Sequence, residues 1–474
     1  MKKRTSKPLS FKLILLLLPL AAGISLLLLA LFGRPRAQRE DYRAIASRTY
    51  DCAFLSMYPT DAYAEEDFQR YLGLTAFRAS YCIPSLPVME QYMRRIARSG
   101  NTITTIYLGI RPDRADPREL LAMIEKYPSV LFEVILAYPS LEYWAGLSDS
   151  EYEQALSAYS AFLTDAAEFP HTQVFFPGRQ EWLIANPGNY ETLWTANEAI
   201  SRTLLLECTI SGEHFITPER AQSFSEELAA LTRKARTSPD SYPDLSDRRL
   251  VFLGDSVIGN YTDSASIPGV VRGLSGAAVY NCGYGGNSAA ESPEAPVSLP
   301  GIARALVSGD LSALPREAQV YQGVSAYLSD YPAGSSGEGL CVVIAYGLND
   351  YFCGYPVSSR EDPLDTTTYC GAVRTAVRAL RDGFPQAQII LLTPSYCYYY
   401  QRGTEPHGDG NYVLEDYVDA VLDLSQELQV DVLDTHHAFG VENGNWERYL
   451  VSDQVHPNAF YRYLIGRALL PLIR

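Results

Sequence analysis

The second half of the chain alternates short apolar runs with longer helical segments, and this alternation restricts its fold more than any other feature. Apolar runs of strand length occur at Arg249–Leu253, Ala278–Asn281, Cys341–Ala345, Gln388–Leu392 and Gln429–Leu433. Helical patterns occur at Thr366–Asp382, Leu414–Leu428 and Ala459–Leu470. Strands separated by helices of this length are joined by right-handed crossovers and pair in parallel. Residues 248–474 are therefore predicted to form a doubly wound α/β domain.

Four short polar blocks accompany these predicted strands. They are Gly254-Asp255-Ser256, Asn281-Cys282-Gly283-Tyr284-Gly285-Gly286, Gly347-Leu348-Asn349-Asp350 and Asp453-Gln454-Val455-His456-Pro457-Asn458. Three of them begin where a strand ends, and the fourth lies between the last strand and the final helix. In such a sheet, ligands bind beyond the carboxyl ends of the strands. All four blocks are therefore expected at one edge of the sheet.

Ser256 and His456 form the candidate nucleophile and base. A serine hydroxyl needs a neighbouring base to take its proton before it attacks well. Asp453 lies three residues before His456, a spacing that lets its carboxylate reach Nδ1 and leaves Nε2 to face the serine. Ser256 could equally be an ordinary helix-capping serine. The combination of the three residue types predicts a Ser-His-Asp triad.

Two blocks supply candidate donors for the oxyanion that forms when a serine attacks an ester. Asn349 directly follows an apolar strand and can offer its side-chain amide. Gly286 and Ser256 can each offer a backbone N–H. A glycine-rich turn is often only a turn, and Gly283 and Gly285 make the choice of Gly286 ambiguous.

The four blocks together resemble the SGNH (GDSL-type) hydrolase family, named for its Ser, Gly, Asn and His. The family's first block continues with Leu where this chain has Val257. The resemblance implies a flavodoxin-like three-layer α/β/α domain over residues 248–474 and a carboxylic ester hydrolase that uses no cofactor or metal. It also implies an acylated glycan or lipid as substrate. An O-acyltransferase would use the same residues, and a non-catalytic glycan-binding surface protein is the competing class.

The amino-terminal segment has the features of a membrane anchor. Residues 13–32 are apolar apart from Pro19, Gly23 and Ser25, and a helix of twenty residues is about 30 Å long, enough to span a bilayer core. A cleaved signal peptide is the alternative, but its apolar part is usually shorter and ends in a small-residue site. Residues 1–12 carry five positive charges, against the three of Arg34, Arg36 and Arg39 in the first part of the 33–47 stalk. This asymmetry predicts a single-pass membrane protein with a cytoplasmic 1–12 tail and an extracytoplasmic catalytic domain.

Residues 48–235 are predicted to form a second α/β domain. A polar, proline-containing linker at 236–247 joins it to the domain of residues 248–474. Strand-like runs occur at Cys52–Met57, Ile103–Ile110, Val130–Ala137 and Thr172–Phe176, and helical patterns at Pro117–Glu125 and Ser150–Glu168. Tyr58 stands where a repeat of the C-terminal pattern would have its serine, and Ser211 and His214 where it would have Asp and His. A degenerate copy of the same fold is one hypothesis, and an unrelated α/β domain is the other. A different strand order would rule out the copy.

Net charge and cysteine spacing bear on whether the protein binds nucleic acid, forms disulfides or binds a metal. Residues 1–39 hold eight basic side chains and no acidic one, which leaves 31 basic and 55 acidic side chains beyond them, a net charge of −24. Such an acidic surface argues against a nucleic-acid partner. The eight cysteines lack CxxC spacing, although Cys353 and Cys370 could pair across a loop. His436-His437 could bind a metal, but adjacent side chains on an extended chain point apart, which favours a loop role.

Overall fold

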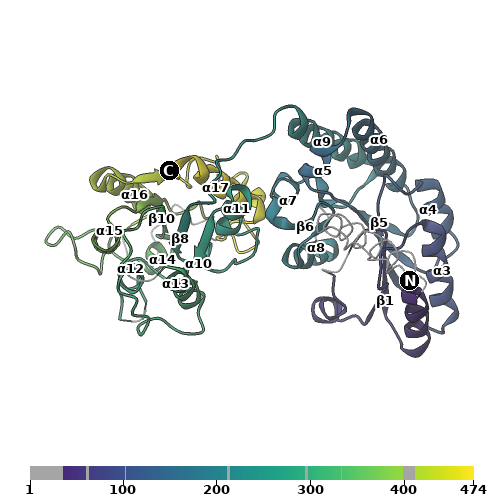
Figure 1. Ribbon diagram of the computed structural model, residues 1–474, viewed down its shortest axis with the longest axis horizontal. Helices are drawn as coiled ribbons and strands as arrows, with labels where there is room; N and C mark the ends of the chain where they lie inside the picture. Colours follow the sequence, from purple (N-terminus) through teal and green to yellow (C-terminus); the bar gives the residue numbers. More distant parts are fainter. Residues whose placement is uncertain are drawn as a thin grey trace, which may run out of the picture. The chain divides into compact units, whose positions relative to one another are not determined.

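The computed structural model describes residues 36–59, 63–101, 103–210, 214–293, 297–331, 334–398 and 412–474. The chain divides into two compact units (Figure 1). Unit 1 comprises residues 1–139, 147–177 and 201–230, and unit 2 comprises residues 140–146, 178–200 and 231–474. Each unit is therefore built from more than one stretch of the chain, and each contains its own five-stranded sheet.

Unit 2 contains the α/β domain that the sequence predicts. Its strands are β8 (Arg249–Gly254), β9 (Ala278–Asn281), β10 (Leu340–Ala345), β11 (Gln388–Leu392) and β12 (Asp431–Leu433). They are all parallel and lie in the order β12-β11-β10-β8-β9. β12 is two residues shorter than expected because Gln429, at φ 52°, ends the preceding helix in the left-handed conformation.

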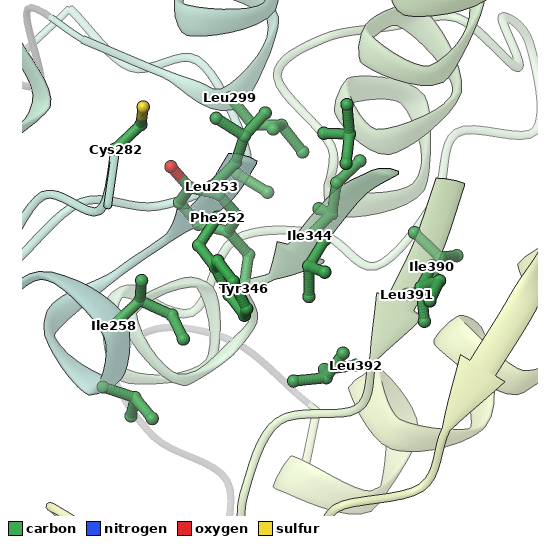
Figure 2. Close-up of a cluster of buried hydrophobic side chains, with 14 of the residues drawn as sticks. Phe252, Leu253, Ile258, Cys282, Leu299, Ile344, Tyr346, Ile390, Leu391 and Leu392 are labelled. Atoms are coloured by element: carbon green, nitrogen blue, oxygen red, sulfur yellow. The ribbon is translucent and has the colours of Figure 1, made fainter. Parts of the chain in front are cut away.

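Two groups of helices pack in unit 2. One group contains α12 (Leu299–Ser308), α15 (Tyr369–Gly383) and α16 (Leu414–Leu428), and the other pairs α11 (Ile267–Ser275) with α17 (Ala459–Leu469). Figure 1 shows β8 and β10 between the two groups. The central strands β8, β10 and β11 are consequently apolar and buried along most of their length, as expected for a parallel sheet with both faces covered. Figure 2 shows Phe252 and Leu253 of β8, Ile344 of β10 and Leu391 of β11 in the core around the sheet, where each is at most 2% exposed.

Unit 1 contains a second parallel sheet. Its strands are β1 (Cys52–Ser56), β2 (Ala76–Arg78), β3 (Thr105–Ile110), β4 (Leu131–Leu136) and β5 (Thr172–Phe175), in the order β2-β1-β3-β4-β5. The predicted helices appear as α4 (Pro117–Ile124) and α6 (Asp149–Ala166). β2 is not among the strands predicted from the sequence, because three residues are too few to show a strand pattern. Residues 36–47, in the expected stalk, are helical, and Asp41 in this helix accepts a hydrogen bond from Tyr92 at 2.6 Å.

The two sheets share one strand order. Counted within each unit, both run 2-1-3-4-5, so the strand order does not rule out the hypothesis of a duplicated fold. This order is common among doubly wound proteins. Tyr58 is buried and its hydroxyl donates to the Ile135 carbonyl at 3.4 Å. His214 is also buried, with Nε2 3.5 Å from Glu207, whereas Ser211 lies outside the described residues.

Two further expectations concern the membrane and the cysteines. Residues 13–32 lie outside the described residues, and none of the described helices is both long and apolar enough to cross a bilayer. Cys370 is a buried free thiol, so the pairing of Cys353 with Cys370 that the sequence left open does not occur in the structure. Cys370 lies in the first turn of α15, in the core of unit 2.

Candidate active site

Ser256 lies where β8 turns sharply into a short helix. Gly254 ends the strand, and a side chain there would meet the Ala345 carbonyl of β10 at 2.9 Å. Asp255 caps α10 (Ser256–Gly259) by accepting a hydrogen bond from the Val257 N–H at 2.9 Å. Ser256 is thus the first residue of the helix and is half-buried. Because α10 is only four residues long, its dipole contributes little at Ser256.

His456 and Asp453 lie in a tight turn between β12 and α17. His456 Nε2 is 2.8 Å from Ser256 Oγ, and Nδ1 is 2.6 Å from Asp453 Oδ2. The other carboxylate oxygen of Asp453 accepts from the N–H groups of Val455 and His456, each at 2.9 Å. Gln454 adopts a positive φ of 66° to close this turn. Ser256, His456 and Asp453, the three residues selected from the sequence, therefore form one continuous hydrogen-bonded relay.

The surroundings keep the Asp453 carboxylate ionised. Partial burial opposes ionisation, but the hydrogen bonds from the His456 and Val455 backbones and the His456 ring outweigh it. Together they lower the pKa of the Asp453 carboxyl below its ordinary value. An ionised Asp453 accepts the Nδ1–H of His456 and holds the tautomer in which Nε2 can accept the serine proton.

The glycine-rich second block packs against α10 where Gly283 of the block meets Gly259 of the helix. A Cβ on Gly283 would lie 2.6 Å from the Gly259 nitrogen, so the two backbones meet where no side chain fits. The Asn281 side chain reinforces this contact by donating to the carbonyls of Ile258 and Tyr261 at 2.9 and 3.1 Å. The second block is therefore fixed against the helix that carries Ser256.

Gly286 is the glycine of this block with open space around its Cα. It has a positive φ of 76°, and nothing lies within 4 Å of the position a Cβ would occupy. Within the described part of the chain, neither the Gly286 N–H nor the Ser256 N–H donates a hydrogen bond. Asn349, in α14 (Leu348–Cys353), donates from Nδ2 to the Asn287 carbonyl at 2.8 Å, which leaves its second N–H available. Of the three glycines, Gly283 packs against Gly259 and Gly285 against the Asn260 side chain, whereas Gly286 has open space beside it.

Two buried carboxyl groups support the site, and the sequence analysis did not single them out. Asp350 accepts hydrogen bonds from the N–H groups of Ala289 and Ala290, both at 2.9 Å, and so ties the segment that follows the second block to the third block. Burial raises the pKa of Asp350 to about 6. Burial, followed by the charge of Asp350, raises the pKa of Asp255 to about 7. Asp255 directly precedes Ser256, and Asp350 directly follows Asn349. Only their burial in the tertiary structure reveals that they position the site.

The aromatic residues near the strand ends divide between packing and surface positions. Tyr351 is fully buried and contacts Phe352 and Tyr417, so it belongs to the core. Tyr398 stacks on Trp446 with ring centroids 5.2 Å apart. Tyr399, Tyr400 and the glycine-rich 403–410 stretch lie outside the described residues.

Several solved structures resemble roughly half of the chain. A protein from Lactobacillus plantarum is 19% identical, with a TM-score of 0.34 over 48% of this chain and 95% of its own. A carbohydrate acetylesterase family member from Sinorhizobium meliloti is 18% identical, with a TM-score of 0.29 over 48% of this chain and 97% of its own. No curated protein matches the chain. Residues 252–460 match the model of the GDSL-like Lipase/Acylhydrolase family.

Proposed function

The C-terminal domain belongs to the GDSL-like lipase/acylhydrolase family and is an SGNH hydrolase, and we propose that it is a membrane-anchored serine esterase. The proposed substrate is an acyl ester, specifically an acetyl ester, of a cell-envelope glycan or lipid. The observation that carries this proposal is the relay from Ser256 through His456 to Asp453, with distances of 2.8 and 2.6 Å. A serine, an imidazole and a carboxylate in this order are the parts that acyl transfer through a covalent intermediate requires.

In the proposed reaction Ser256 Oγ attacks the acyl carbon while His456 Nε2 takes the hydroxyl proton. The negative charge that develops on the acyl oxygen is stabilised by the N–H groups of Ser256 and Gly286 and by the second Nδ2–H of Asn349. His456 then gives its proton to the departing alkoxide, and the acyl group remains on Ser256. Water, activated in turn by His456, releases the acid and restores the serine.

The membrane part of the proposal depends on sequence alone. Residues 13–32 form an apolar stretch of spanning length, with more positive charge before it than after it. We infer a single-pass anchor with both units on the extracytoplasmic side. An enzyme held there would meet acylated surface polymers rather than soluble cytoplasmic esters.

Hydrolysis of p-nitrophenyl acetate by the full-length protein tests the proposal. Ser256→Ala and His456→Ala are each expected to lower kcat by roughly a thousandfold or more, because each removes a group that participates in bond formation. Glu317→Gln, a change at an exposed residue of unit 2, is the control and should retain full activity.

The other outcomes separate the alternatives. Labelling of Ser256 by a fluorophosphonate, together with slow hydrolysis that a sugar acceptor accelerates, would replace the esterase by an acyltransferase. Equal background rates and no labelling in all four proteins would refute a catalytic role and leave a glycan-binding protein.

A further inference from the structure

The chain contains a second Asp-x-x-His turn, and it does not face a serine. Asp434-Thr435-His436-His437 directly follows β12, whereas the catalytic turn directly precedes α17. Asp434 Oδ1 accepts from the N–H groups of His436 and His437, both at 3.2 Å, and Oδ2 is 2.9 Å from His437 Nδ1. Its local geometry thus repeats that of Asp453 and His456, but here the turn faces Glu415.

The expectation that adjacent histidines would point apart is wrong here, because this segment is a turn rather than an extended strand. The Ala438 N–H donates to the Asp434 carbonyl at 3.1 Å, which coils residues 434–438. The ring centroids of His436 and His437 are consequently only 4.8 Å apart. Both rings reach the first turn of α16, where Glu415 lies.

Three possible ligand atoms converge at this point. His437 Nε2 is 3.0 Å from Glu415 Oε1, and His436 Nε2 is 3.4 Å from Glu415 Oε2. The three ligand atoms, one from each residue, all lie within 4.8 Å of one another. Ligand atoms about 2.0–2.1 Å from a tetrahedral zinc ion lie about 3.4 Å from each other. The cluster therefore already has nearly the dimensions of a metal site.

The Nδ1 atom of each histidine ring already has a hydrogen-bond partner. His437 Nδ1 lies 2.9 Å from the Asp434 carboxylate, and His436 Nδ1 lies 3.3 Å from the Pro394 carbonyl. Both partners are acceptors, so each Nδ1 donates its hydrogen and each neutral ring directs the lone pair of Nε2 at the Glu415 carboxylate. Three acceptor groups facing one another require protons or a cation between them. An oxygen partner on the ring nitrogen that does not bind the metal is also the arrangement that orients metal-bound histidines.

We propose that Glu415, His436 and His437 bind a divalent transition-metal ion, with Zn²⁺ the ion that the donors fit best. Two imidazoles and one carboxylate suit zinc, and the single carboxylate leaves the charge of the loaded site positive. Glu415 and His437 are about half exposed, with side-chain exposures of 46% and 51%, so the ion can enter from solvent. The bound ion links the start of α16 to the turn after β12 and stabilises unit 2.

Zinc titration of the full-length protein, purified without a histidine tag and stripped with a chelator, tests this proposal. One Zn²⁺ per chain is expected by calorimetry, and Co²⁺ is expected to give the visible spectrum of a low-coordinate site. His437→Ala and Glu415→Gln should each weaken binding at least tenfold. Asp434→Asn should weaken it about 10- to 100-fold, since it removes the oxygen that orients His437.

His171→Ala is the matched control, because His171 is an exposed histidine of unit 1, and it should bind zinc as the unchanged protein does. Tryptophan fluorescence follows the folding of unit 2, since all four tryptophans lie in it. Zinc should raise the melting temperature of the unchanged protein and not that of His437→Ala. An absence of saturable binding, or a stoichiometry and affinity that none of the three site variants changes, would overturn the proposal and leave a proton-shared cluster.

Discussion

Replacing Gly283 by alanine is the most direct test of how the second block is positioned. The new Cβ would lie 2.6 Å from the Gly259 nitrogen and 2.8 Å from the Gly259 Cα. Both neighbours are backbone atoms of the helix that begins at Ser256, so neither can move aside by rotating a side chain. The block and α10 must separate by about 0.8 Å to restore an ordinary 3.4 Å contact.

This displacement sets the expected size of the effect. Overpacking a tight contact costs about 1–3 kcal/mol of stability. A misplacement of about 1 Å near the reacting atoms costs roughly 100-fold in rate. The hydrogen bond from the Tyr284 N–H to the Gly254 carbonyl, at 2.8 Å, resists the separation and places part of the strain on Gly286. We therefore expect kcat to fall about 10- to 100-fold with little change in KM.

Ester hydrolysis and tryptophan fluorescence during urea unfolding measure the two effects separately. Gly301→Ala in α12 is the matched control, because a Cβ there meets the Ser298 hydroxyl at 3.5 Å and Arg304 Nη2 at 3.9 Å, both ordinary contact distances. It should keep full activity and gain up to about 1 kcal/mol from the better helix propensity of alanine. Unchanged kcat and unchanged unfolding free energy in Gly283→Ala would refute the reasoning, since the close approach would then impose no constraint.

Two further substitutions test the carboxyl groups. Asp453→Asn should lower kcat about 10²- to 10⁴-fold, because an amide favours the wrong histidine tautomer; the exposed Asp310→Asn is its control, and activity above a tenth of the original would contradict the role of Asp453. Asp255 has its pKa raised from an ordinary 3.8 to about 7, so the folded state holds this proton more tightly and the stability of unit 2 should fall as the pH rises from about 4 to about 7. In Asp255→Asn that decline should become shallower, by at most about 1.4 kcal/mol per pH unit. Urea unfolding at several pH values checks this, and parallel pH profiles of the two proteins would show that Asp255 ionises normally.

Local pattern was sufficient to identify the five sheet strands of unit 2, the helices α15, α16 and α17, and the residues of the relay. Apolar runs bounded by glycine or polar residues located all five of its strands, because a strand covered on both faces must be apolar throughout. The Asp453 to His456 spacing was equally informative, since a turn of four residues is a local structure. The start of β12 was misjudged because nothing in the sequence marks Gln429 as left-handed.

The contacts between distant segments came only from the tertiary structure. Ser256 and His456 are 200 residues apart, and whether they meet depends on the strand order β12-β11-β10-β8-β9, which local periodicity does not encode. Packing also distinguishes the glycines, since only the tertiary structure shows that Gly283 is pressed against Gly259 while Gly286 has open space beside it. The two Asp-x-x-His turns make the same point: their sequences fix the same local geometry, and only the fold places a serine opposite His456 and a glutamate opposite His437.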